Sequence, residues 1–225
     1  MKLKKIASLM LAGIMAVSML AGCKSGTPNP NPGEGEGEGN TATGYSVALG
    51  DALADILKDT DVKDVITFAD SNDDKAALED ALGNLGRDQL WFTDDFDAFG
   101  DLQDTEAVAD FKKAAKLDRA TLINGAGAIY DYEYNINKTV KVGDIFYIDS
   151  NVEMSKVINQ IVAEYGNAFA ALEDSLKVVG ENDKQLVYDF NYTVSVSVVN
   201  VPSPDVTIYT GSTNFIAVTV TRTVA

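Results

Sequence analysis

The sequence predicts an α+β domain, in which an antiparallel sheet of four or five strands carries helices packed on one face. Residues 186–198 and 216–220 alternate apolar with polar side chains, whereas residues 158–176 space their apolar side chains along one helix face. Alternation with one polar face is typical of antiparallel strands that are covered on one side only. We therefore expect the helix to cover the apolar side of the sheet.

The first half of this domain is predicted to be mainly helical. Apolar residues recur at i, i+4, i+7 and i+8 over residues 49–57, which predicts a helix. Residues 62–68 suit a short strand, and residues 73–85 form a second amphipathic segment. A third helix is expected over residues 108–115, after Asp104 as a possible cap.

The second half alternates between strands and one long helix. Residues 129–136 alternate with tyrosines on one side, and residues 140–148 are predicted to return as their hairpin partner. The tyrosine stripe is core if a helix covers it, and a binding surface if it is open. Ser150 and Glu153 match the capping box S-x-x-E, so a long helix is predicted over residues 151–178, ending near Gly180. The three tyrosines of the stripe are Tyr130, Tyr132 and Tyr134.

The N-terminus has the layout of a bacterial export signal. Three lysines in the first five residues precede an uncharged, largely apolar run over residues 6–21, which is shorter than the roughly 20 apolar residues of a spanning helix. Leu20-Ala21-Gly22-Cys23 then resembles the lipobox of bacterial lipoproteins. The resemblance covers residues 1–23 alone. It implies cleavage before Cys23, acylation of its thiol, and a chain anchored in the cell membrane on the extracytoplasmic side.

Residues 23–44 are predicted to be a lipidated stalk between the signal peptide (1–22) and one globular domain (45–225). The stalk alternates proline with polar residues and then glycine with glutamate, and it contains no large apolar side chain after Cys23. A segment that can bury nothing cannot offset its ordering entropy, so disorder is expected. Its expected role is to hold the domain clear of the lipid surface.

The charge of the chain excludes one class of partner. Loss of residues 1–22 would leave 15 basic and 34 acidic residues, a formal charge of −19. Because phosphate binding requires clustered Lys and Arg, nucleic acid is not expected as a partner. The expected partners are the lipid bilayer, through acylated Cys23, and an envelope protein or glycan that the sequence does not identify.

Several kinds of catalysis are also excluded. The chain has no histidine, and its one cysteine is Cys23, so Ser-His-Asp and Cys-His catalysis and the usual histidine zinc site are impossible. Paired carboxylates are the remaining catalytic chemistry, which leaves open a glycosidase-like hydrolase acting on envelope or dietary polysaccharide. No catalytic motif is recognised, so a non-enzymatic binding or interaction protein without a cofactor is the leading expectation.

A calcium-dependent adhesion or structural module is the second alternative. Asp70, Asn72 and Asp74 space oxygen ligands as D-x-N-x-D, like the opening of an EF-hand loop. Lys75 and Ala81 stand where that loop requires glycine and a bidentate glutamate, so the match fails beyond its start. Asp73 and Asp74 also stand where a helix N-terminus favours negative charge, which accounts for them without any metal and is the favoured interpretation.

The remaining candidate site lies in residues 87–106, where aromatic and acidic residues are interleaved. Such a segment either presents aromatic platforms and carboxylates to a ligand, or is a long loop anchored by buried aromatics. Its candidate ligand-binding residues are Trp91, Phe92, Asp94, Asp95, Phe96, Asp97 and Phe99.

Overall fold

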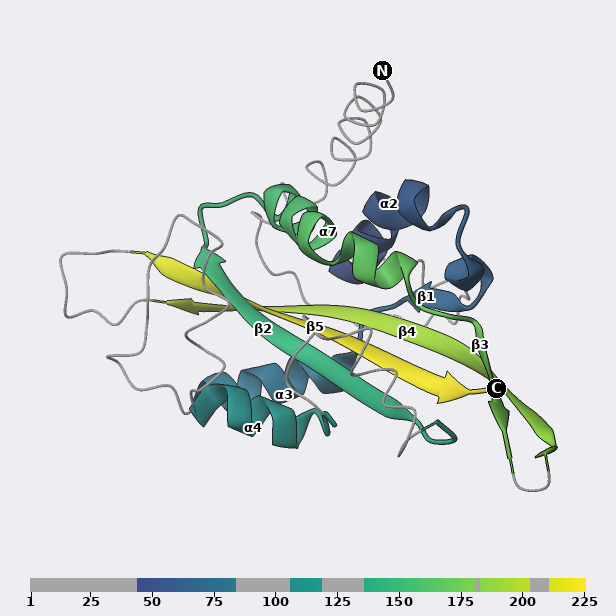
Figure 1. Ribbon diagram of the computed structural model, residues 1–225. Helices are drawn as coiled ribbons and strands as arrows, with labels where there is room; N and C mark the ends of the chain where they lie inside the picture. Colours follow the sequence, from purple (N-terminus) through teal and green to yellow (C-terminus); the bar gives the residue numbers. More distant parts are fainter. Residues whose placement is uncertain (1–43, 84–105, 119–135, 181–182, 203–210) are drawn as a thin grey trace, which may run out of the picture.

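Three long antiparallel strands form the centre of the molecule (Figure 1). The computed structural model describes residues 44–83, 106–118, 136–180, 183–202 and 211–225. Strand β5 (Ser212–Val224) lies between β4 (Gln185–Pro202) and β2 (Val140–Asp149), and both pairings are antiparallel. The two alternating stretches near the end of the chain are thus strands, as their patterns predict, and the structure makes them neighbours in the sheet.

Two short strands complete a five-stranded sheet, which confirms the α+β class and the number of strands. Strand β3 (Ser175–Val179) forms an antiparallel hairpin with the start of β4. Strand β1 (Ile66–Phe68) pairs with residues 192–194 of β4 in parallel, so the sheet is mixed and the purely antiparallel prediction is wrong. Alternation of apolar and polar residues shows which face of the sheet a side chain occupies, but it does not show the direction of the strand. The sequence pattern therefore could not distinguish parallel from antiparallel pairing.

Helices cover both faces of the sheet, which corrects the prediction of helices on one face (Figure 1). Helices α2 (Tyr45–Leu57) and α7 (Met154–Ala170) bury their apolar sides on one face. Helices α3 (Asn72–Gly83) and α4 (Glu106–Ala114) bury theirs in a second core on the opposite face. The predicted helices in the first half are confirmed. A 3-10 turn, Asp61–Asp64, replaces the first half of the predicted strand over residues 62–68.

The polar side of the strands is buried because its side chains are short. Ser195 and Ser197 of β4 and Thr219 of β5 are all less than 5% exposed, beneath α3. Small hydroxyl side chains let a helix approach the sheet closely, whereas long charged side chains would have kept this face in water. The polar residues of these strands therefore predicted a face in contact with water, but in the structure this face is covered by a helix.

The long helix predicted over residues 151–178 is wrong at both ends. Helix α7 begins at Met154, with Glu153 as an N-cap that makes no side-chain cap bond, so the predicted capping box does not form. Ser150 instead lies in the turn that follows β2, where its N–H donates to the carbonyl of Ser212 at 2.9 Å. The helix ends at Ala170, and residues 175–179 are strand β3, which pairs with β4.

Gly166 of α7 marks the place where α7 packs closely against α2. A β-carbon at this position would lie 3.0 Å from Cδ1 of Ile56 and 3.6 Å from Cδ2 of Leu53. The glycine thus serves close helix packing on the first face of the sheet.

Candidate functional site

Most of the predicted site residues lie outside the described part of the chain. This holds for Cys23, for the tyrosine stripe at 130–134, and for every residue of the aromatic and acidic segment from Trp91 to Phe99. The roles predicted for them stay predictions. Asp70, Asn72 and Asp74 are described, and each can be placed.

Asp70 caps a helix that begins far from it in the sequence. Its Oδ1 accepts a hydrogen bond from the N–H of Ser46 at 3.2 Å, in the first turn of α2. A helix N-terminus has unpaired N–H groups and a partial positive charge, and a carboxylate satisfies both. A β-carbon on Gly44 would lie 1.5 Å from Oδ2 of Asp70, so glycine leaves the room that this carboxylate occupies.

Asp74 is buried between α3 and the sheet. Its side chain is only 3% exposed, forms an ion pair with Lys141 of β2, and accepts a hydrogen bond from Oγ1 of Thr219 at 2.7 Å. Its own N–H donates to Oγ of Ser71 at 3.1 Å, so Ser71 caps α3. Asn72, the first residue of α3, is exposed.

The D-x-N-x-D motif is therefore divided between two structural tasks. Asp70 serves the start of α2, and Asp74 fixes α3 to the opposite face of the sheet. The described residues form no group of three or more His, Cys, Asp or Glu side chains that could hold a metal ion. Both carboxylates already accept hydrogen bonds from protein donors, which satisfies them without a cation.

Millimolar calcium is expected to leave the thermal unfolding midpoint within about 1 °C of its value in EDTA, because neither Asp70 nor Asp74 needs a further ligand. A ligand that binds the native state alone would raise the midpoint. The measurement is thermal unfolding of the full chain in both buffers. A rise of several degrees that Asp70→Asn abolishes would contradict the expectation for this motif. A rise that survives Asp70→Asn would instead place a calcium site among other acids, such as those of residues 94–104.

The buried carboxylates do not support hydrolysis by an acid pair. Asp74 and Asp144 are each 2% exposed, but they lie on opposite faces of the sheet. Asp74 faces Thr219 beneath α3, whereas Asp144 of β2 lies on the face covered by α7, close to Tyr165. A glycosidase requires its two carboxylates on either side of one bond, about 5–10 Å apart in a cleft. These two cannot flank a common substrate.

Tyr165 of α7 is a core residue with suppressed acidity. Burial raises the pKa of its phenol far above the usual range, and the negative charges of Asp144 and Glu164 act in the same direction. Its ring packs edge-on against Phe146, with centroids 6.0 Å apart. A phenol that stays protonated in this setting contributes packing rather than base catalysis.

Arg222 is a buried charge that sequence reasoning missed. It is fully buried, its guanidinium lies 4.7 Å from the centroid of the Phe190 ring, and Nη2 donates to the carbonyl of Lys138 at 3.4 Å. Cation–π contact and a carbonyl acceptor help to compensate the charge for lost water. A signal was present in the sequence, because Arg222 continues the apolar side of β5 after Val218 and Val220.

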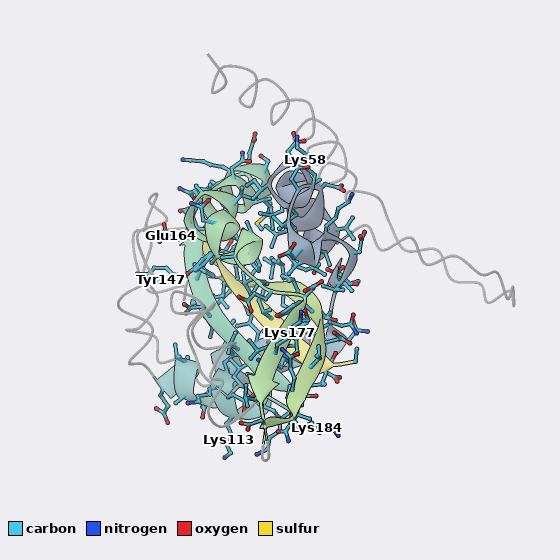
Figure 2. All side chains as sticks on the ribbon, turned by 45° about the vertical axis from the view of Figure 1, so that its right-hand side comes forward. Lys58, Lys113, Tyr147, Glu164, Lys177 and Lys184 are labelled. Carbon is cyan, nitrogen blue, oxygen red and sulfur yellow. The ribbon has the colours of Figure 1, made fainter. Side chains whose placement is uncertain are left out.

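The surface feature that best suits recognition is the β3–β4 hairpin, residues 175–189. It extends away from the helices, past the C-terminal end of β5 (Figure 1). Three of the four large apolar side chains that the described residues expose lie on it: Val179 (74% exposed), Val187 (52%) and Leu186 (37%). Figure 2 shows Lys177 and Lys184 on the same hairpin, with Lys184 near its tip. Exposed apolar side chains that gather in this way are typical of interaction sites.

Comparison with known proteins identifies no relative of the chain. No family model, curated protein or solved structure matches it. Among the described residues, no helix is long and apolar enough to span a membrane.

Proposed function

We propose that this chain is a membrane-anchored extracytoplasmic lipoprotein that binds another component of the cell envelope and is not an enzyme. The observation that carries the anchor is Leu20-Ala21-Gly22-Cys23, preceded by a basic start and an uncharged, largely apolar run. Two acyl chains hold a protein far more firmly than one, since each buried CH₂ contributes about 0.8 kcal/mol. A stalk over residues 24–44 would let the domain reach a partner beyond the lipid surface.

Binding rather than catalysis is supported by the surface and by the carboxylates. The β3–β4 hairpin exposes valines and a leucine at the end of the domain, where a partner can reach them. The chain lacks histidine, and its two described buried carboxylates lie on opposite faces of the sheet. Both observations favour a recognition surface over a catalytic cleft.

Replacing Cys23 with alanine is expected to abolish acylation, because the thiol is the proposed attachment point. The full chain is expressed in a bacterium grown with an alkyne-tagged palmitate, and the label on the protein is measured. The variant is also expected to keep its first 22 residues, which mass spectrometry would detect, since the lipoprotein cleavage follows acylation. Ser25→Ala, two residues further on, is the control that keeps label and cleavage. Label that persists in Cys23→Ala would overturn the proposed anchor.

A further inference from the structure

Within the part of the chain that the structure describes, strand β3 has an open edge. The N–H of Phe190 donates to the carbonyl of Asp174, and the N–H of Gly180 donates to the carbonyl of Lys184. Since hydrogen-bonded and non-hydrogen-bonded pairs alternate along an antiparallel ladder, Leu176 and Val178 bond to β4 as well. The backbone groups of Ser175, Lys177 and Val179 therefore point away from β4, and among the described residues no strand lies beside them.

Apolar side chains lie on both faces of the hairpin next to this edge. Val178 is directly opposite Leu186 on one face, and Lys177 is opposite Val187 on the other face, with Val179 diagonal to Val187. An exposed strand edge with apolar neighbours is a template for pairing with another strand. A short strand with one central lysine limits such pairing without preventing it.

We propose that the open edge of β3 pairs antiparallel with β3 of a second copy of this chain, about a two-fold axis at Val178. In this register Lys177 and Val179 of the partner subunit form a hydrogen-bonded pair, and the symmetry repeats it, which gives four backbone hydrogen bonds. Val178 faces Val178 of the partner subunit, so the row Leu186–Val178 continues into its symmetric copy.

The side chains select this register over its neighbour. An axis at Lys177 would place two lysines directly opposite each other, and like charges at opposite positions destabilise a pair of strands. An axis at Val178 places each Lys177 opposite a valine, where its aliphatic stem can lie on apolar surface. A two-fold axis uses both open edges, so pairing stops at a dimer and does not continue into a fibre.

The dimer is expected to be weak in solution. A five-residue strand pair buries less than the roughly 800 Å² per partner of a standard stable interface. The formal charge of −16 adds repulsion between the copies, so salt is expected to favour association. Confinement to a membrane would raise the effective concentration, a contribution that rests on the proposed function.

The test uses a cysteine at the proposed axis. The full chain with Val178→Cys is purified in detergent and oxidised, and formation of a disulfide dimer is measured. Facing residues in a non-hydrogen-bonded pair have Cα atoms about 4.5 Å apart, within the range of a disulfide, whereas two copies of residue 175 or 179 would be too far apart. We expect Val178→Cys to form the dimer at least about tenfold faster than the matched controls Ser175→Cys and Val179→Cys. Equal rates at the three positions, or no dimer at any of them, would overturn the proposal.

Two further measurements keep the possible outcomes distinct. Lys177→Pro removes an outward N–H without removing a bond to β4, so it is expected to stop cross-linking of Val178→Cys while the thermal midpoint is retained. Cross-linking that persists in this variant would rule out backbone pairing along this edge. An adduct with a different protein when cells are oxidised would rule out the second copy as the occupant. The wild-type chain is oxidised in parallel. A disulfide in wild type would show a free thiol at Cys23 and count against the lipid anchor alone, with the dimer then tested in the Cys23→Ala background.

Discussion

Replacing Asp74 with alanine is expected to lower the free energy of unfolding by about 3 kcal/mol, because the variant leaves the ammonium of Lys141 largely buried without its partner. The side chain of Lys141 is 21% exposed, so water can partly solvate its ammonium in the variant. The expected loss of unfolding free energy is therefore at the lower end of the range for broken buried ion pairs. The hydroxyl of Thr219 loses its acceptor as well. Denaturant unfolding of the variant and wild type measures the difference from the shift in midpoint at constant slope.

Two controls separate the ion pair from the helix charge. Asp73 is the exposed neighbour in the same first turn of α3, and Asp73→Ala is expected to cost less than about 1 kcal/mol through the helix dipole alone. The double variant Asp74→Leu with Lys141→Leu removes both charges and is expected to return to within about 1 kcal/mol of wild type. If Asp73→Ala and Asp74→Ala cost the same, the buried pair contributes nothing specific.

The helices on the two faces were predictable where their apolar spacing was complete. Leu49, Leu53 and Leu57 are buried in α2, and Leu78 and Leu82 in α3, as the periodicity predicts. Such patterns succeed because burial of one face is what makes a short helix stable.

The boundary between α7 and β3 could not be predicted because the local pattern fits both structures. Leu172 and Leu176 continue the i, i+4 spacing of the helix, and Leu172 is buried in the same core. The β-branched Val178 and Val179 favour a strand, and the start of β4 supplies the partner that decides the outcome. The spacing of apolar residues along one helix face is a local pattern, and it contains no information on a pairing strand about ten residues further along the chain.

The candidate site shows the same limit of local reasoning. Asp70 and Asp74 were recognisable in the sequence as possible oxygen ligands, but Lys141 lies 67 residues from Asp74 and Thr219 lies 145 residues away. No spacing rule connects them, because the sheet alone brings β2 and β5 beneath α3. The motif that resembled a calcium loop is therefore a helix cap and a buried ion pair in the structure.

Replacing Phe215 with alanine is expected to cost about 3–5 kcal/mol, as much as Phe146→Ala, although the two residues lie on opposite faces of the sheet. Phe146 belongs to the core beneath α2 and α7, and Phe215 to the core beneath α3 and α4; each is 1% exposed. Phe215 also packs against Tyr147, with ring centroids 6.2 Å apart. Equilibrium unfolding of both variants measures the two losses.

Val187→Ala, on the exposed hairpin, is the control expected to stay within about 0.5 kcal/mol of wild type. If the sheet were covered on one face only, Phe146→Ala would show the full loss of stability and Phe215→Ala would lose less than about 1 kcal/mol. The ratio of the two losses therefore distinguishes a core on both faces from the fold covered on one face that polar alternation suggests.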